Sequence, residues 1–351
     1  MSGQTEPTIT LDVREIIPRE RHPLILKTFD DWAHRSLRKR IIMLRKLLVP
    51  FMLFSLVTGV AISAQEMDTA AIISGAWVRA TVTTAASQSE ETPEAAMPMG
   101  GVSAAYMIIE NPLANAIRLS SVETNAAAVV ELHETQMQGD VMQMRPVEGG
   151  IVIAANESAA LQPGGFHVML LDLQQNLVEG EAIQAALNFE ILDDSGEASG
   201  ETFTQIIGLP ILTEPPAPHT LIIQNVWGRP AAGDGSDTMP AGSVSAVYLT
   251  IYNPGETQER LLAAETEAAD IVEIHEVTMQ NDVMQMRPVE GVDIPASETV
   301  ALAPGGLHIM LLDVRQPLLT GEAIMLHLHF ESGEEISLAV PIYDRLMMMA
   351  S

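Results

Sequence analysis

The feature that most constrains this chain is a segment that occurs twice, 142 residues apart. The first copy, His133 to Val147, reads HETQMQGDVMQMRPV, and the second, His275 to Val289, reads HEVTMQNDVMQMRPV. Pro-Gly-Gly-x-His-x-Met follows each copy, at 163–169 and at 304–310. Repeats of solenoid proteins are about 20–50 residues long, so a repeat of this length indicates two duplicated domains.

The similarity extends along both copies and defines the expected domains. Trp77 aligns with Trp227 near the start, where we expect both residues to anchor a core, and Tyr106 aligns with Tyr248. The first copy has eight extra residues in a loop between these two landmarks, and loops that accept insertions lie on the surface. The expected divisions are a first domain at 73–212, a Pro-rich linker at 213–219, a second domain at 220–345 and a tail at 346–351.

Both repeats have the pattern of β-structure. Short apolar runs are separated by Gly, Pro, Asn and Asp, and no long segment has helical periodicity. We therefore expect an all-β fold in which each of the two tandem repeats forms a β-sandwich. The Ala-rich stretch Ala263–Ala269 is the one place where a short helical turn is expected. The predicted strands of the first repeat are 104–109, 129–133, 141–145, 166–171 and 183–189.

Composition excludes several functions. The sequence after residue 64 carries 40 acidic residues against eight arginines, and so acidic a surface does not bind nucleic acid by neutralising phosphates. The chain has no cysteine, which excludes disulfides, zinc–thiolate sites, blue copper sites and thiol catalysis.

The N-terminal part contains an export signal. Residues 43–64 have a short basic start, an apolar run from Leu47, and the small residues Ala61, Ser63 and Ala64. This is the layout of a signal peptide, which is either cleaved or retained as a membrane anchor. Either outcome places the repeats outside the cytoplasm, in the periplasm or on the outer face of the membrane. Residues 1–42 are then a disordered extension, or precede a true start at Met43.

Spacing brings four potential metal ligands together in the first repeat. If Gln138-Gly139 forms the hairpin turn, His133 lies directly opposite Met144, with Cβ atoms about 5 Å apart. His167 and Met169 are two residues apart, so on a strand they share one face.

The second repeat offers the same four side chains, with Gln280-Asn281 as the expected turn. His275 would then oppose Met286, and His308 and Met310 would share a face. Two imidazoles and two thioethers suit Cu(I), whereas zinc, calcium and magnesium prefer other donors.

The ligand spacing resembles that of periplasmic copper chaperones of the PCuAC family. Their pattern is His, ten residues, Met, twenty-one residues, His-x-Met, and His275, Met286 and His308 reproduce it. The first repeat has ten and then twenty-two residues, which places one extra residue near Gly149-Gly150. The resemblance implies two tandem cupredoxin-like domains, each a Greek-key β-sandwich that holds one Cu(I). It also implies delivery of copper to the binuclear centre of cytochrome c oxidase, so that subunit II of the oxidase, or another copper acceptor, would be the partner.

We therefore expect a Cu(I) metallochaperone and not an enzyme, because two histidines per site are few for oxidase chemistry. The alternatives are a copper storage or resistance protein, and a metal-free β-sandwich that binds other proteins. Glu134 and Glu276 follow the first histidine of each site, where they either support the ligand or are simply solvated. His327 and His329 occur only in the second repeat, so a further site there is not favoured.

Overall fold

The computed structural model describes residues 71–81, 101–138, 141–231, 239–280 and 283–344. Within these ranges every regular element is a strand, and none of the described residues forms a helix suited to crossing a membrane. The expected extension at 1–42, the signal segment at 43–64, most of the inserted loop and the tail at 346–351 lie outside the described residues.

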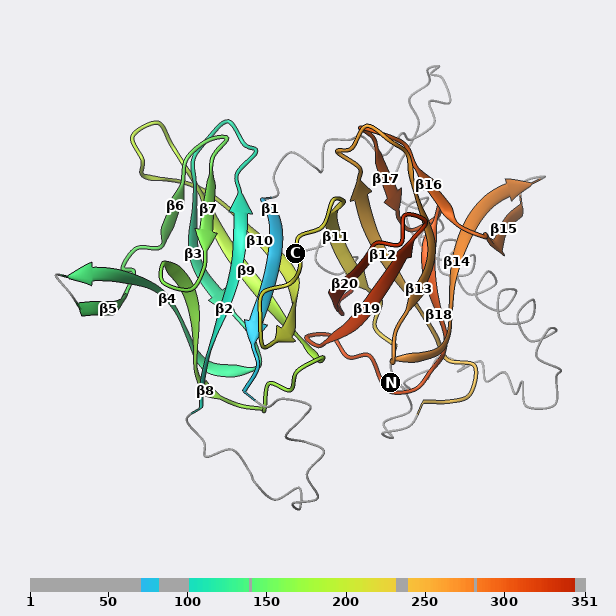
Figure 1. The fold of residues 1–351 in the computed structure, drawn as a ribbon, viewed down its shortest axis with the longest axis horizontal. Coiled ribbons are helices and arrows are strands. Elements are labelled where there is room, and N and C mark those ends of the chain that lie inside the picture. Colours follow the sequence, from blue (N-terminus) through green and yellow to red (C-terminus); the bar gives the residue numbers. More distant parts are fainter. Residues whose placement is uncertain (1–70, 82–100, 139–140, 232–238, 281–282, 345–351) are drawn as a thin grey trace, which may run out of the picture. The chain divides into compact units, whose positions relative to one another are not determined.

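The first domain consists of ten strands in two layers (Figure 1). One layer has the order β5-β4-β8-β2-β1 with β7 beside β2, and the other has the order β10-β9-β3-β6. A short parallel pairing of β1 with β10 connects them, at Val78↔Ile211 and Arg79↔Leu212. The strands are β1 (Ile72–Arg79), β2 (Val102–Glu110), β3 (Ile117–Glu123), β4 (Ala127–Gln138), β5 (Val141–Pro146), β6 (Ile151–Ile153), β7 (Ser158–Leu161), β8 (Phe166–Leu173), β9 (Ala182–Leu192) and β10 (Ala198–Leu212).

The second domain repeats this topology. Its layers have the orders β11-β12-β18-β14-β15, with β17 beside β12, and β16-β13-β19-β20. A parallel bridge between Gly228 and Ile342 corresponds to the pairing of β1 with β10. The strands are β11 (Ile222–Gly228), β12 (Val244–Tyr252), β13 (Glu259–Glu265), β14 (Ala269–Gln280), β15 (Val283–Pro288), β16 (Val292–Ile294), β17 (Thr299–Leu302), β18 (His308–Val314), β19 (Ala323–Phe330) and β20 (Glu335–Pro341).

The sandwich arises because one face of each sheet is apolar. Strand β9 alternates buried and half-buried side chains, and β19 does the same. In each domain the buried residues of the two layers form one main hydrophobic core. The all-β, cupredoxin-like fold class expected from the sequence is therefore confirmed. The helical turn expected at Ala263–Ala269 is wrong, because β13 continues to Glu265 and β14 begins at Ala269.

Each domain also has a small apolar cluster on the opposite face of its first layer. A β-bulge between Ser74 and Trp77 includes Gly75 with φ +56°, and it pairs Trp77 with Tyr106. Opposed residues share a face, so Trp77 packs outside the main core with Ala104 and Tyr106. The expectation that Trp77 anchors a core holds only for this second, smaller cluster.

The second domain repeats the bulge, with Asn225 at φ +52° in place of glycine. Asparagine tolerates this left-handed conformation better than most residues. Trp227 is thereby paired with Tyr248, and both are buried with Ala246 and Met310.

A buried asparagine fixes the end of strand β2. The Nδ2 of Asn111 donates to the carbonyl oxygens of Asn115 at 2.9 Å, Ile153 at 3.1 Å and Ala154 at 3.0 Å. Its Oδ1 accepts from the amide of Leu113 at 3.0 Å. The side chain therefore ties one loop to the end of β6, and Asn253 does the same in the second domain.

Candidate metal centre

The hairpin that carries the first histidine has a different register from the expected one. Thr135, not His133, lies opposite Met144, and His133 lies opposite Pro146. The second domain has the same shift, with Val277 opposite Met286 and His275 opposite Pro288. The predicted pairing of His133 with Met144 is thus wrong by two residues, because the hairpin closes at Gln138↔Val141.

A shift of two residues preserves the face of the sheet, since side chains alternate with a period of two. Met144 therefore still projects from the same face as His133, as a diagonal neighbour whose Cβ lies about 7–8 Å away in ideal geometry. The hairpin extends beyond the body of the domain in Figure 1, and Met144 is 55% exposed.

The two histidines of each domain meet across neighbouring strands. His133 on β4 lies directly opposite His167 on β8, with ring centroids 5.9 Å apart. His275 and His308 repeat the pair, with centroids 5.8 Å apart. The four imidazoles thus form two pairs, one per domain, on the face opposite the main core.

The methionine of each His-x-Met motif lies one step further along the same face. Met169 is opposite Glu131 on one side and Ala104 on the other, and it packs against the cluster of Trp77 and Tyr106. In the second domain, Met310 belongs to the cluster around Trp227. The aromatic cluster therefore forms the apolar support beneath one thioether of each site.

Hydrogen bonds set the tautomers of the first pair of histidines. His133 Nε2 lies 2.7 Å from the carboxylate of Glu131, and His167 Nδ1 lies 3.0 Å from the carbonyl oxygen of Gly165. An ionised carboxylate and a carbonyl can only accept, so these two nitrogens carry the protons. The other nitrogens, His133 Nδ1 and His167 Nε2, are then lone-pair donors.

Those two lone-pair nitrogens are the ones that lack a partner. His133 Nδ1 and His167 Nε2 are both buried with no hydrogen bond to any described residue. Buried polar atoms are rarely left unsatisfied, and such an exception indicates an absent ion or ligand. The two nitrogens, with the thioethers on the same face, form a donor set that fits Cu(I).

The second domain has the same contacts at equivalent positions. His275 Nε2 lies 2.7 Å from Glu273, and His308 Nδ1 lies 3.0 Å from the carbonyl oxygen of Gly306. Burial lowers the pKa of His308, and the nearby His275 lowers it further against the opposing effect of the Gly306 bond. The imidazole of His308 is therefore held in the neutral form that a metal requires.

Of the two roles considered for Glu134 and Glu276, support of the neighbouring histidine is not the one that the structure shows. Glu134 and Glu276 point to the other side of the hairpin, where they pair with Arg145 at 3.5 Å and Arg287 at 2.9 Å. Glu131 and Glu273 contact the histidines instead. The available signal was their position two residues before each histidine, because residues i and i+2 share a strand face.

Other candidate residues do not join either centre. His327 and His329 lie on β19, in the other layer, where His327 contacts Ser337 and His329 lies near Glu265 and Glu335. No group of three or more His, Asp or Glu side chains is arranged to hold a metal ion among the described residues. The candidate centres have two histidines each, and their remaining donors are thioethers.

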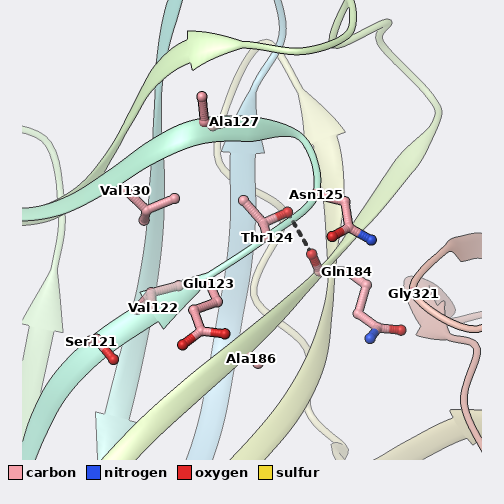
Figure 2. Close-up of a pocket in the computed structure, with 11 residues that line it drawn as sticks. Ser121, Val122, Glu123, Thr124, Asn125, Ala127, Val130, Gln184, Ala186 and Gly321 are labelled. Carbon is pink, nitrogen blue, oxygen red and sulfur yellow. Dashed lines mark hydrogen bonds between the residues drawn. The ribbon is translucent and has the colours of Figure 1, made fainter.

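An open pocket in the first domain is also separate from the histidines. It lies along the end of β3 and the turn into β4, where Thr124 donates to the carbonyl oxygen of Gln184 at 2.7 Å (Figure 2). The described residues that line it include no histidine or methionine. It therefore offers no soft metal donors.

Comparisons with known proteins match both repeats. A family model described as "LpqE-like: Putative lipoprotein LpqE-like" matches residues 72–198 and again 221–342. A protein of Leifsonia xyli subsp. xyli named "Putative lipoprotein Lxx21020" is 32% identical over 123 residues, which are 35% of this chain and 69% of that protein.

Solved structures also resemble parts of the chain. The "Copper-bound PCuAC domain from PmoF2" is 21% identical, with a TM-score of 0.29, and the match covers 36% of this chain and 94% of the other. The "Solution structure of CuI-DR1885 from Deinococcus Radiodurans" is 22% identical, with a TM-score of 0.27, covering 35% and 80%. Scores this low assign no ligand, so the nature of the site depends on its own side chains.

Proposed function

Because the chain belongs to the LpqE-like family, and because each repeat gathers two histidines and two methionines on one sheet face, we propose that it is an extracytoplasmic Cu(I) metallochaperone. The ligands would be His133, Met144, His167 and Met169 in the first domain, and His275, Met286, His308 and Met310 in the second. The observation that carries the proposal is the pair of buried imidazole nitrogens of His133 and His167 that no described residue satisfies.

Copper is the cargo, and the chemistry is ligand exchange. Thioethers carry no proton at neutral pH and favour Cu(I), so they bind the ion without the redox liability of a thiolate. The centre lies on a sheet face and not inside the main core. An acceptor can therefore approach the ion and replace its ligands one at a time.

The family name and the N-terminal segment support an extracytoplasmic location. The family and the Leifsonia relative are both described as lipoproteins. Several kinds of lipid anchor are attached to cysteine, and the sequence contains none. We therefore propose that the apolar segment 43–64 directs export or holds this chain at the outer face of the membrane.

The proposed acceptor is the binuclear copper centre of cytochrome c oxidase subunit II. Its support is the spacing of the second copy, which matches the copper-chaperone pattern without insertion. The soluble domain of subunit II, mixed with copper-loaded chain, should gain copper while this chain loses it. A storage or resistance protein would instead retain its copper against that acceptor.

An anaerobic Cu(I) competition titration tests the proposal. We expect two ions per wild-type chain, and one ion for His275→Ala or for Met286→Ala. Glu276→Ala is the matched control, because Glu276 neighbours His275 but pairs with Arg287, and it should keep both ions. A wild-type chain that binds no Cu(I) would refute the metallochaperone and support a metal-free interaction module.

A further inference from the structure

The two centres have the same residues but different solvent exposure. The side chain of His133 is 13% exposed, whereas that of His275 is fully buried. Met169 is half-buried, whereas Met310 is 7% exposed. At the first histidine and at the methionine of the His-x-Met motif, the second centre is therefore less exposed to solvent than the first.

The hairpin methionine shows the largest difference. Met286 is half-buried and packs against the cluster of Trp227, Ala246, Tyr248 and Met310. Met144 is exposed, and it is not among the described residues that pack against the Trp77 cluster. In the second domain both thioethers thus contact one apolar cluster, while in the first only Met169 does.

One substitution between the repeats adds an aromatic ring to the second cluster. Tyr343 packs against Trp227, with ring centroids 5.8 Å apart, and its amide donates to the carbonyl oxygen of Gly228. Leu212 occupies the equivalent place beside Trp77, where β10 pairs with β1. The aromatic ring of Tyr343 covers more of the cluster than a leucine side chain does.

We propose that the two centres have different roles: the second retains Cu(I), the first exchanges it, and Tyr343 is the positioning residue that sets the difference. This inference rests on the proposed copper function. A methionine that is already packed loses fewer conformations on binding, and its departure must disrupt apolar contacts. An exposed methionine leaves freely and admits an incoming ligand.

The kinetics of copper loss from the full chain test this directly. The fully loaded protein is mixed with excess bathocuproine disulfonate, a Cu(I) chelator, and the coloured complex is followed in time. We expect two phases of equal amplitude whose rates differ about tenfold, since differences between related sites are mostly differences in dissociation rate. His275→Ala should leave only the fast phase, and His133→Ala only the slow phase.

Reciprocal substitutions test the part played by Tyr343. Tyr343→Leu should accelerate the slow phase about tenfold towards the fast one, and Leu212→Tyr should slow the fast phase. Tyr343→Phe keeps the aromatic ring and should retain the slow rate. If Tyr343→Leu releases copper quickly and Tyr343→Phe slowly, the contact of the ring with the cluster explains the change, and a general loss of stability does not. Thermal unfolding followed by far-UV circular dichroism shows whether each variant is folded.

The outcomes separate this inference from the proposed function. Two bound ions that leave at one common rate would overturn the division of roles and leave the metallochaperone intact. A fast phase that belongs to the second domain would likewise overturn the division of roles and leave the metallochaperone intact. A chain that binds no copper would instead overturn the function itself.

Discussion

His133 on β4 lies directly opposite His167 on β8, and each ring keeps one buried nitrogen that no described residue satisfies. Glu131 and the Gly165 carbonyl hold the remaining two nitrogens. The two donor nitrogens are thus defined before any metal binds. Such preorganisation reduces the cost of ordering ligands around the ion.

The supporting carboxylates give the first prediction. In a His275→Ala background, which leaves the first centre alone, Glu131→Ala should lower the Cu(I) affinity about tenfold, because the carboxylate orients His133. Glu131→Gln keeps an acceptor for the imidazole N–H and should recover most of the loss. Competition titration measures the affinity, and Glu134→Ala is the matched control with no expected effect. Equal losses for Glu131→Ala and Glu134→Ala would show that overall charge, and not the contact with His133, matters.

The histidines of β19 give the second prediction. Because His327 and His329 lie in the other layer of the second domain, the double variant His327→Ala/His329→Ala should still bind two Cu(I) ions. Metal analysis of the isolated loaded protein provides the count. A loss of one ion would identify β19 as part of a copper site and contradict the placement of both sites on the other layer of each domain.

The buried amide of Asn111 gives the third prediction. Asn111→Ala removes one acceptor and leaves three carbonyl oxygens without their donor, and each buried unsatisfied group costs about 1–3 kcal/mol. We expect the free energy of unfolding of the first domain to fall by about 3 kcal/mol. Urea denaturation measures it, with the exposed Asn176→Ala as control. Similar stability of the two variants would show that water replaces the amide.

A pair of neighbouring glycines gives the fourth prediction. Gly149 and Gly150 have φ of +82° and +85°, so alanine is strained at both, by about 1–2 kcal/mol. A Cβ at Gly149 meets nothing within 4 Å, whereas a Cβ at Gly150 would lie 2.4 Å from the carbonyl oxygen of Leu119. Gly150→Ala should therefore lower the melting temperature clearly more than Gly149→Ala. Equal shifts would mean that only the backbone conformation matters.

The sequence was sufficient for the fold class, because duplicated alternating segments with polar turns have few solutions other than two β-sandwiches. It was also sufficient to place the two histidines and the two methionines on one face, since that depends only on parity along the strands. The error in the hairpin register left this parity unchanged because it was a shift of two residues.

Two aspects of the centre were not predicted. The register of the hairpin depends on which two residues form its turn, and the polar residues around its tip are compatible with more than one choice. Glu134 is adjacent to His133 in sequence, but adjacent residues on a strand point to opposite faces. The relevant neighbour was therefore Glu131.

The separation of each aromatic cluster from its main core has a consequence for how such domains change over time. Residues that surround the histidines are not the residues that hold the two layers together. Ligands can thus be gained, lost or exchanged during evolution without a compensating change in the interior. A duplicated domain is then free to diverge in its chemistry while both copies keep one scaffold.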